Sequence, residues 1–326
     1  MTLRVLVAGG AGYIGSHTAK ALKAAGHVPV VLDDLSTGHE EAVRFGPFVR
    51  GSIQDAACVA RTVREHGIDA VLHFAACAYV RESLENPRKY FRNNVANTVH
   101  FLDALLEAGV KTLVFSSTCA VYGIPPSLPI VEATPTNPIN PYGQSKLMIE
   151  DVLRWYGKIE KLSWMALRYF NAAGADPEGE LGEHHEPETH LIPLLVEAAL
   201  GQREPVRIFG TTFPTPDGTA VRDYIHVADL AAAHVRAVTH LAAGGASESV
   251  NLGTGKGTSI REVIASVERA TGKPVPVIFG DPSPGDPPTL VADPSRAHAL
   301  GHRFEHDLDS MVATAVAWAK KRLHSA

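Results

Sequence analysis

Six short apolar runs alternate with amphipathic stretches in the first half of the chain. The runs are Val5–Ala8, Val28–Leu32, Phe48–Ile53, Ala70–Ala75, Thr112–Ser117 and Trp164–Asn171. Helices are expected near 55–66, 87–108 and 141–157, and another is expected to follow the first run through Ala25. Continuous apolar strands separated by helices are typical of a parallel sheet covered on both faces. With right-handed crossovers, the pattern predicts an α/β fold with a doubly wound, Rossmann-type sheet.

The pattern changes after Asn171. The segment Gly174–Glu188 is rich in glycine, proline and acidic residues and has no period, so we expect a long functional loop. Later elements are shorter, and Asp281–Pro288 is again dense in proline and glycine. We therefore predict a Rossmann domain over 1–172 and a smaller C-terminal substrate lobe, mainly over 173–326. Segments at about 222–255 are expected to return to the first domain.

Charge and hydropathy exclude two classes of partner. The net charge is −5 and the pI is near 6.3, which is the opposite of the basic footprint that nucleic-acid binding needs. Val28–Leu32 and Ile192–Leu200 are among the longest apolar runs, and they are far too short to span a membrane. The first predicted strand begins close to Met1, so no signal peptide is expected.

Cysteine and histidine positions predict a reduced, metal-free protein. The odd number of cysteines lacks metal-ligand spacing, which suggests reduced core thiols in the cytoplasm: Cys58, Cys77 and Cys119. His184–Glu186 with His190 resembles a metal-binding helix. However, His185 and His190 are five residues apart rather than four, and Pro187 interrupts the segment. No metal site is therefore predicted.

A glycine turn follows the first predicted strand and opens the first helix. Gly9, Gly12 and Gly15 have the spacing Gly-x-x-Gly-x-x-Gly. Such glycines let the backbone turn sharply and approach a pyrophosphate, which the N–H groups at a helix N-terminus bind. Asp33 ends the second strand, where a carboxylate accepts hydrogen bonds from ribose hydroxyls and repels a 2′-phosphate. These features predict NAD rather than NADP, although Asp33 or Asp34 could instead cap the next loop.

A tyrosine and a lysine lie one turn apart near the start of a predicted helix. Asn140 suits the N-cap, Pro141 suits the first helical position, and Tyr142 and Lys146 then share one face. A tyrosine with a pKa of about 10 becomes a base at neutral pH if nearby positive charge lowers that pKa by about three units. Thr118 ends the fifth strand and could relay a proton between a substrate hydroxyl and Tyr142.

Many motifs carry a resemblance to known families. The chain resembles the extended short-chain dehydrogenase/reductase family at Gly9–Gly15, Asp33, Ser116–Tyr122 and Tyr142–Lys146. It is similar to the UDP-glucose 4-epimerase branch of that family at Leu167–Asn171, Thr189–Pro193, Asp217–Thr219, Arg222–Val227 and Asn251–Gly255. The resemblance implies an isomerase that interconverts UDP-glucose and UDP-galactose through a 4-keto sugar with tightly bound NAD. In it Tyr142 would remove the proton of the C4 hydroxyl.

The resemblance also implies positions for both ligands. NAD contacts are implied at Gly9, Gly12, Tyr13, Ile14, Gly15, Asp33, Asp34, Ser36, Thr37, Ser52, Ile53, Phe74, Ala75, Ala76, Asn94, Tyr142, Lys146 and Phe170. UDP-sugar contacts are implied at Thr118, Tyr142, Asn171, Leu191, Phe209, Arg222, Asp286 and Leu290. Within that set, Asn171 and Arg222 would meet the pyrophosphate. Phe209 and the Leu191 backbone would border the uracil, and Asp286 would bind a ribose hydroxyl.

Several positions depart from the family pattern. Ser52 replaces a usual aspartate beside the adenine, and Ser283 replaces an arginine that commonly grips the nucleotide phosphates. Losing such an arginine contact costs about 1.5–3 kcal/mol. Arg81 and Asn97 occupy positions that are often glycine. Leu290 is intermediate in size at the position beside the sugar C2 group, which favours UDP-glucose and UDP-galactose over their N-acetyl forms.

Other functions stay open. A UDP-pentose or UDP-uronate 4-epimerase would use the same chemistry. A nucleotide-sugar dehydratase needs an acid directly after Thr118, which Cys119 and Ala120 do not supply. A non-catalytic NAD-sensing protein would be free to lose Tyr142 or Lys146, and both are present.

The resemblance further implies a homodimer in which the helices near 87–108 and 141–157 pair. The spacing of Phe101, Leu105 and Ala108 fits that role, but these residues could equally face the sheet. We expect His73 and Cys119 to be packing residues.

Overall fold

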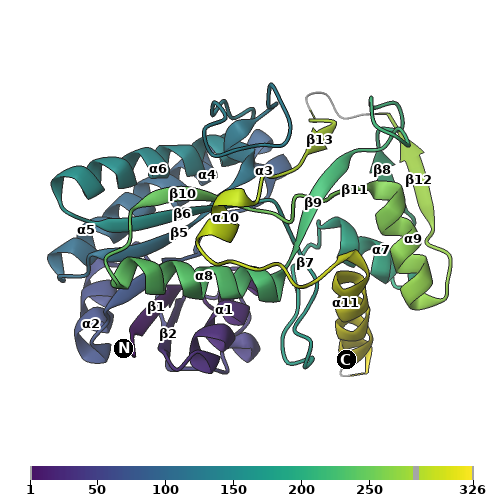
Figure 1. Ribbon diagram of the computed structural model, residues 1–326. Coiled ribbons are helices and arrows are strands. Elements are labelled where there is room, and N and C mark those ends of the chain that lie inside the picture. The colour runs from purple at the N-terminus through teal and green to yellow at the C-terminus, as the bar shows by residue number, and fades with distance from the viewer. Residues whose placement is uncertain (1, 282–285, 325–326) are drawn as a thin grey trace.

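The computed structural model describes residues 2–281 and 286–324, and Figure 1 shows the arrangement of its elements. Ser283, which the sequence marks as a departure in the nucleotide site, lies outside the described residues. In the part of the chain that the structure describes, no helix combines the length and apolar character that crossing a membrane requires.

Within the described residues, seven parallel strands form the central sheet. In spatial order they are β10 (Glu248–Leu252), β6 (Ser163–Tyr169), β5 (Thr112–Thr118), β4 (Ala70–His73), β1 (Arg4–Ala8), β2 (Val28–Asp33) and β3 (Phe48–Arg50). The strand order reverses between β1 and β4, so the doubly wound Rossmann sheet is confirmed. In open α/β sheets, ligands bind at such a switch point, beyond the carboxyl ends of the strands.

Helices cover both faces of this sheet (Figure 1). One face carries α1 (Tyr13–Ala24) and α8 (Val227–Ala242), and the other carries α2 (Ala56–His66), α5 (Asn97–Glu107) and α6 (Pro141–Ile159). Phe101 and Leu105 are buried in the core between α5, α2 and the sheet, with exposed fractions of 0% and 2%. Of the two orientations that the sequence allows for these residues, the structure has the one facing the sheet.

The expected helix near 87–108 is broken into three parts: α4 (Pro87–Tyr90), a π-helix over Phe91–Ala96, and α5. The wider π turn contains the buried Asn94, whose side chain accepts from the Cys77 N–H at 2.8 Å and donates to the Ser145 hydroxyl at 3.1 Å. Such turns occur frequently at functional sites. Periodicity alone does not reveal one, because the apolar pattern continues through it.

Two predicted strands end earlier than expected. The third ends at Arg50 rather than Ile53, and the fourth at His73 rather than Ala75. After His73 the backbone stays beside β1, because the N–H groups of Phe74 and Ala75 both bond to the Ala8 carbonyl. The apolar run therefore continues past the strand and lines the end of the sheet.

The smaller lobe lies to the right in Figure 1. Its first sheet contains β7 (Asn171–Ala173), β9 (Val221–His226), β11 (Gly257–Ser259) and β13 (Thr289–Leu290). A second sheet pairs β8 (Val206–Phe209) with β12 (Val277–Gly280). Its core lies among α7 (Leu191–Ala199), α9 (Ile260–Thr271) and α11 (Leu308–Leu323). Four short helices complete the fold: η1 (Glu40–Ala42), α3 (Val80–Glu85), η3 (Cys119–Tyr122) and α10 (Ser295–Ala299).

The chain passes between the lobes more than once. After β9 it runs through α8 and into β10, which pairs with β6 along the edge of the central sheet. The segment between β7 and α7 contains no helix or strand, as expected for a long loop. Cys58 and Cys119 are buried, Cys77 is partly buried, and all three thiols are free.

Candidate active site

The glycine turn lies at the switch point between β1 and β4. A methyl group at Gly9 would lie 2.5 Å from the Ala75 nitrogen, and one at Gly15 would lie 2.3 Å from the Gly9 carbonyl oxygen. Gly12 is more open, since its nearest neighbour would be 3.5 Å away. No side chain among the described residues caps the first turn of α1 at Gly12. The glycine turn leaves the backbone N–H groups in the first turn of α1 free to bind a phosphate. These residues therefore fit a dinucleotide.

Asp33 lies at the end of β2, directly beside the turn. Its carboxylate accepts hydrogen bonds from the N–H groups of Ala11 at 2.9 Å and Leu35 at 2.8 Å. Burial raises its pKa, while these two hydrogen bonds oppose that rise. Asp34 accepts from the Ser36 N–H at 3.0 Å. Both carboxylates therefore hold the loop, and Asp33 keeps further acceptor capacity for a ribose hydroxyl.

Other candidate cofactor residues surround the same end of the sheet. Phe74, Ala75 and Ala76 continue β4 and are partly buried, as are Tyr13 and Ile14 at the start of α1. The remaining candidates differ in exposure: Ile53 and Phe170 are buried, Ser52 is partly buried, and Ser36 and Thr37 are exposed.

Thr118, Tyr142 and Lys146 come together at the carboxyl end of β5. All three are buried, with exposed fractions of 6%, 8% and 3%. The Thr118 hydroxyl lies close enough to Tyr142 to favour its ionised form. The Lys146 ammonium donates to the Ser116 carbonyl at 2.7 Å and lies 4.8 Å from the centre of the Phe115 ring. A proton path from a bound hydroxyl through Thr118 or directly to Tyr142 is therefore available.

Burial pushes both ionisable groups toward their neutral forms. Burial raises the pKa of Tyr142 well above 10, and the Thr118 hydroxyl only partly opposes this. Burial also lowers the pKa of Lys146 to about 7. The positive charges expected from the sequence lower the tyrosine pKa, and burial opposes them. Additional positive charge near Tyr142 is needed to make it a base at neutral pH.

Gly143 is a functional position that the sequence reasoning missed. The helix α6 begins as expected, because the Asn140 side chain accepts from the Gly143 N–H at 2.8 Å and Pro141 occupies the first turn. A methyl group at Gly143 would lie 2.5 Å from the Ala120 carbonyl oxygen. Only glycine allows α6 to approach the segment after Thr118 this closely. A glycine inside a helix pattern was the available signal.

A buried ion pair fixes α6 against the sheet. Arg168 on β6 contacts Glu150 on α6, with Nη2–Oε2 and Nε–Oε1 distances of 2.5 and 2.9 Å. Glu150 also accepts from the hydroxyls of Ser117 at 2.6 Å and Ser249 at 3.1 Å. Neither charged side chain is more than 3% exposed. Glu150 is one turn beyond Lys146, so the pair sets the position of the helix face that carries Tyr142 and Lys146.

Candidate nucleotide-binding residues line the adjoining edge of the smaller lobe. Leu290 pairs with Arg222, and Asn171 pairs with Tyr224 on the same strand, β9. Burial lowers the pKa of Arg222, whose positive charge in turn acts on Cys119 and Asp286. The positive charge of Arg222 therefore lies near Cys119, the residue that follows Thr118.

The other candidates occupy the rim. Phe209 ends β8, is 39% exposed, and lies under the Arg81 guanidinium at 5.3 Å from its ring centre. Arg81 belongs to α3, so the two lobes meet at this contact. Leu191 begins α7 and is partly buried, and Asp286 is exposed.

Two residues have packing roles. The His73 ring is 2% exposed, makes a 3.1 Å hydrogen bond with the Thr98 hydroxyl, and has its pKa lowered to about 3 by burial. Burial raises the pKa of the Cys119 thiol to about 12, so it is a poor acid.

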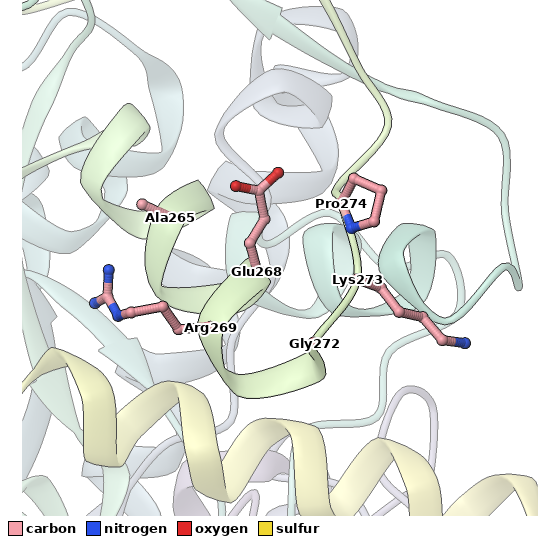
Figure 2. Close-up of a pocket in the computed structure, with 6 residues that line it drawn as sticks. All are labelled: Ala265, Glu268, Arg269, Gly272, Lys273 and Pro274. Carbon is pink, nitrogen blue, oxygen red and sulfur yellow. The ribbon is translucent and has the colours of Figure 1, made fainter.

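A pocket at the C-terminal end of α9 is not part of the candidate active site (Figure 2). Its charged side chains, Glu268, Arg269 and Lys273, point away from one another and do not converge on a ligand.

A dinucleotide fold whose switch point holds a buried hydroxyl, tyrosine and lysine defines an enzyme that moves a proton and a hydride at an alcohol. The sequence profile of one such family matches residues 5–253. The chain belongs to the NAD dependent epimerase/dehydratase family.

Relatives extend over nearly the whole chain. The UDP-glucose 4-epimerase of Azospirillum brasilense is 52% identical over 320 residues, which cover 97% of this chain and 92% of the relative. The crystal structure of UDP-glucose 4-epimerase from Brucella ovis in complex with NAD has a TM-score of 0.95 and 53% identity, covering 97% and 98% of the two chains. A Stenotrophomonas maltophila UDP-glucose 4-epimerase, with bound NAD and formylated UDP-arabinopyranose, has a TM-score of 0.96 and 39% identity, covering 99% and 100%.

Replacing Gly15 by alanine should remove the bound cofactor. The new methyl group would lie 2.3 Å from the Gly9 carbonyl oxygen, so the turn has to open and lose its grip on the pyrophosphate. Chromatography of nucleotide released from the purified protein measures this. Gly280→Ala is the control, because its methyl group would have no neighbour closer than 4.0 Å. Equal NAD content in both variants would disprove the role of the turn.

Replacing Glu150 by glutamine should lower the free energy of unfolding by about 3–5 kcal/mol, since it leaves the Arg168 charge buried without its partner. Denaturant unfolding measures the change. Asp151→Asn is the matched control on the same helix, because the exposed pair of Asp151 with Arg154 contributes only about 0–1 kcal/mol. Similar losses in the two variants would contradict the argument.

Proposed function

We propose that this chain is a UDP-glucose 4-epimerase, an isomerase that interconverts UDP-glucose and UDP-galactose through a 4-keto sugar. The observation that carries the proposal is the buried contact of Tyr142 with Thr118, one helical turn from Lys146, at the end of β5. The names of the full-length relatives support the same reaction. A panel of UDP-sugars, analysed for their 4-epimers, tests it.

NAD, when bound, supplies the acceptor and donor of the C4 hydride. Tyr142 takes the proton from the C4 hydroxyl, either directly or through Thr118, and returns it at the end of the cycle. Lys146 in its charged form stabilises the tyrosine anion, and the two opposite charges offset part of the cost of burying each. All three groups are shielded from water, which strengthens these interactions. Gly143 and the Glu150–Arg168 pair hold the tyrosine at the strand end.

We assign the cofactor contacts that the family resemblance implies, and the position of these residues around the end of the sheet supports the assignment. Gly9, Gly12 and Gly15, with the N–H groups of Tyr13 and Ile14, bind the pyrophosphate. Asp33 binds the adenosine ribose and selects NAD. The remaining cofactor contacts are Asp34, Ser36, Thr37, Ser52, Ile53, Phe74, Ala75, Ala76, Asn94 and Phe170. Asn94 also holds its neighbours in place, because its side chain bonds to the Cys77 backbone and to the Ser145 hydroxyl.

Substrate contacts come mainly from the smaller lobe. Arg222 and Asn171 bind the UDP pyrophosphate, and Phe209 with the backbone of Leu191 binds the uracil. Asp286 binds the ribose, and Leu290 lies beside the sugar. Arg222 is suited to its role because a guanidinium can hold two phosphate oxygens at once.

A second candidate function is 4-epimerisation of UDP-pentoses. The S. maltophila structure contains a formylated UDP-arabinopyranose, which shows that a related fold accommodates a pentose. The dehydratase alternative is disfavoured because the buried Cys119 thiol cannot act as the extra acid. A protein that only senses NAD would give no epimer in the UDP-sugar panel.

We also infer the state of the protein in the cell. A homodimer through α6 and the helices near it is supported by large apolar residues on its outer surface, with Trp155 62% and Ile159 61% exposed. Three free thiols support a cytoplasmic location.

We divide the chain into a Rossmann domain over 1–172 and a substrate lobe mainly over 173–326. In this division β9, α8 and β10 lead back from the lobe to the first domain.

The change Tyr142→Phe should lower turnover by about 10²–10⁴-fold while NAD stays bound, because it removes the proton acceptor and not the cofactor pocket. Steady-state kinetics and nucleotide extraction measure the two properties. Tyr156→Phe is the control on the same helix, since its hydroxyl bonds to Asp103 away from the site. Near-normal turnover of the Tyr142 variant would remove it from the mechanism.

The change Leu290→Ser should raise activity on N-acetylated UDP-sugars selectively. Leu290 packs against a buried cluster that contains Cys119 and Phe170, so its branched end is held beside the catalytic strand. Relief of crowding in such a pocket changes specificity by roughly 10–200-fold. Comparing kcat/KM on both sugar pairs measures the effect, with the exposed Leu84→Ser as control. If the unaltered protein has equal kcat/KM on both sugar pairs, Leu290 does not restrict the N-acetylated sugars.

A further inference from the structure

Four side chains with metal-binding atoms converge in the loop between β7 and α7. They are Glu183, His185, Glu188 and His190, and one ligand atom from each lies within 4.8 Å of all the others. From the sequence no metal site is expected here, because the spacing of His185 and His190 does not suit a helix. The segment is a loop, so the helical spacing rule does not apply to it.

The spacing of the atoms matches a small tetrahedral site. The Glu183 Oε1 atom is 3.3 Å from His185 Nδ1 and 2.7 Å from His190 Nδ1. Glu188 Oε2 is 3.6 Å from His185 Nδ1, and Glu188 Oε1 is 3.3 Å from His190 Nδ1. A tetrahedral Zn²⁺ with bonds of about 2.0–2.1 Å places its ligand atoms about 3.3 Å apart. Of these four separations the 2.7 Å one has to widen most, by about half an ångström, and one oxygen of Glu188 has to face both histidines.

Two of these atoms are buried without a well-formed hydrogen bond. The Glu183 side chain is 6% exposed, and neither its Oε1 nor His185 Nδ1 makes a hydrogen bond of good geometry, although Oε1 lies 2.7 Å from His190 Nδ1. A buried carboxylate oxygen without a well-formed hydrogen bond costs free energy, and a cation between the groups removes that cost. His190, 46% exposed, closes the cluster on its outer side.

The surroundings hold the ligands in place, as the outer groups of metal sites do. The Glu188 carboxylate accepts from the N–H groups of Thr189 at 2.7 Å and His190 at 2.8 Å. The rings of Tyr13 and Tyr79 pack edge-on against the His185 ring, at 6.3 and 6.1 Å between centroids. A cavity of about 500 Å³, lined in part by Glu183 and Glu188, gives an ion access.

We propose that Glu183, His185, Glu188 and His190 bind one Zn²⁺ ion. Two carboxylates neutralise its charge, two imidazoles complete the tetrahedron, and four protein ligands make the site structural. Because the Tyr13 ring packs on His185, the ion would join this loop to the glycine turn of the Rossmann domain.

The rival arrangement is two protonated imidazoles paired with the two carboxylates. Burial lowers the pKa of both histidines, but Glu183 and Glu188 outweigh it and raise the pKa of His185 to about 9 and of His190 to about 10. Protons and a metal compete for the same Nδ1 atoms, so binding of Zn²⁺ should release protons and weaken as the pH falls.

Metal binding is tested on the full-length protein after treatment with a chelator and dialysis. Titration with Zn²⁺ should show one ion per chain by elemental analysis, with a rise in Tm, and Co²⁺ should give the visible bands of a tetrahedral site. His185→Gln and Glu183→Gln should each weaken Zn²⁺ binding by at least about a hundredfold. His184→Gln is the matched control, because its ring stacks on His39 and is not part of the cluster.

Less than a tenth of an equivalent of Zn²⁺, with no cobalt bands and no shift in Tm, would overturn the proposal in favour of protonated histidines. Equal weakening by the His184 and His185 variants would also overturn it. If a variant fails to fold, the titration of the unaltered protein still decides. No sugar is used, so the result is independent of the proposed epimerase activity.

Discussion

The buried pair of Glu150 with Arg168 is the interaction on which the active site depends. It joins α6 to β6, and through the hydroxyls of Ser117 and Ser249 it also reaches β5 and β10. A buried ion pair is rarely the most stable choice for a core, but it accepts only one arrangement of its partners. Here that arrangement sets how closely α6 packs on the central sheet, and therefore where Tyr142 lies relative to Thr118. Gly143 permits the same approach at the other end of the contact.

Tight packing shifts the charge states of Tyr142 and Lys146, the two groups that we propose to be catalytic. The burial that positions Tyr142 and Lys146 raises the pKa of the first and lowers the pKa of the second. Both groups are therefore held away from the charge states that proton transfer needs. A site of this kind becomes reactive when a further positive charge enters it. Its reactivity therefore depends on whether a ligand that carries this charge is bound. The same burial excludes water, so a keto sugar formed there is protected from the solvent.

Much of the fold and of the candidate site could be predicted from the sequence, for identifiable reasons. The parallel sheet follows from apolar runs such as Val28–Leu32, and the N-cap of α6 follows from Asn140 and Pro141, because these signals are local. The π-helix around Asn94 could not be predicted, since it depends on a partner seventeen residues away, at Cys77. Periodicity also gives no information on a cluster such as Glu183 with His190, which only the path of a loop brings together. A charged residue within an apolar strand, such as Arg168, was a signal that could have been used.

The place of β10 at the edge of the sheet has a consequence for how the chain folds during synthesis. The strand pairs with β6, about eighty residues earlier, and its Asn251 bonds to the Tyr122 hydroxyl across 129 positions. The first domain therefore stays incomplete on the ribosome until the segment through Leu252 has emerged. Until then β6 presents an unpaired, apolar edge of the kind that associates with other chains. Long-range pairing of this sort slows folding. We infer that only the first part of the substrate lobe, from β7 to β8, is made before the nucleotide domain closes, and that the exposed edge of β6 meanwhile favours chaperones that shield strand edges.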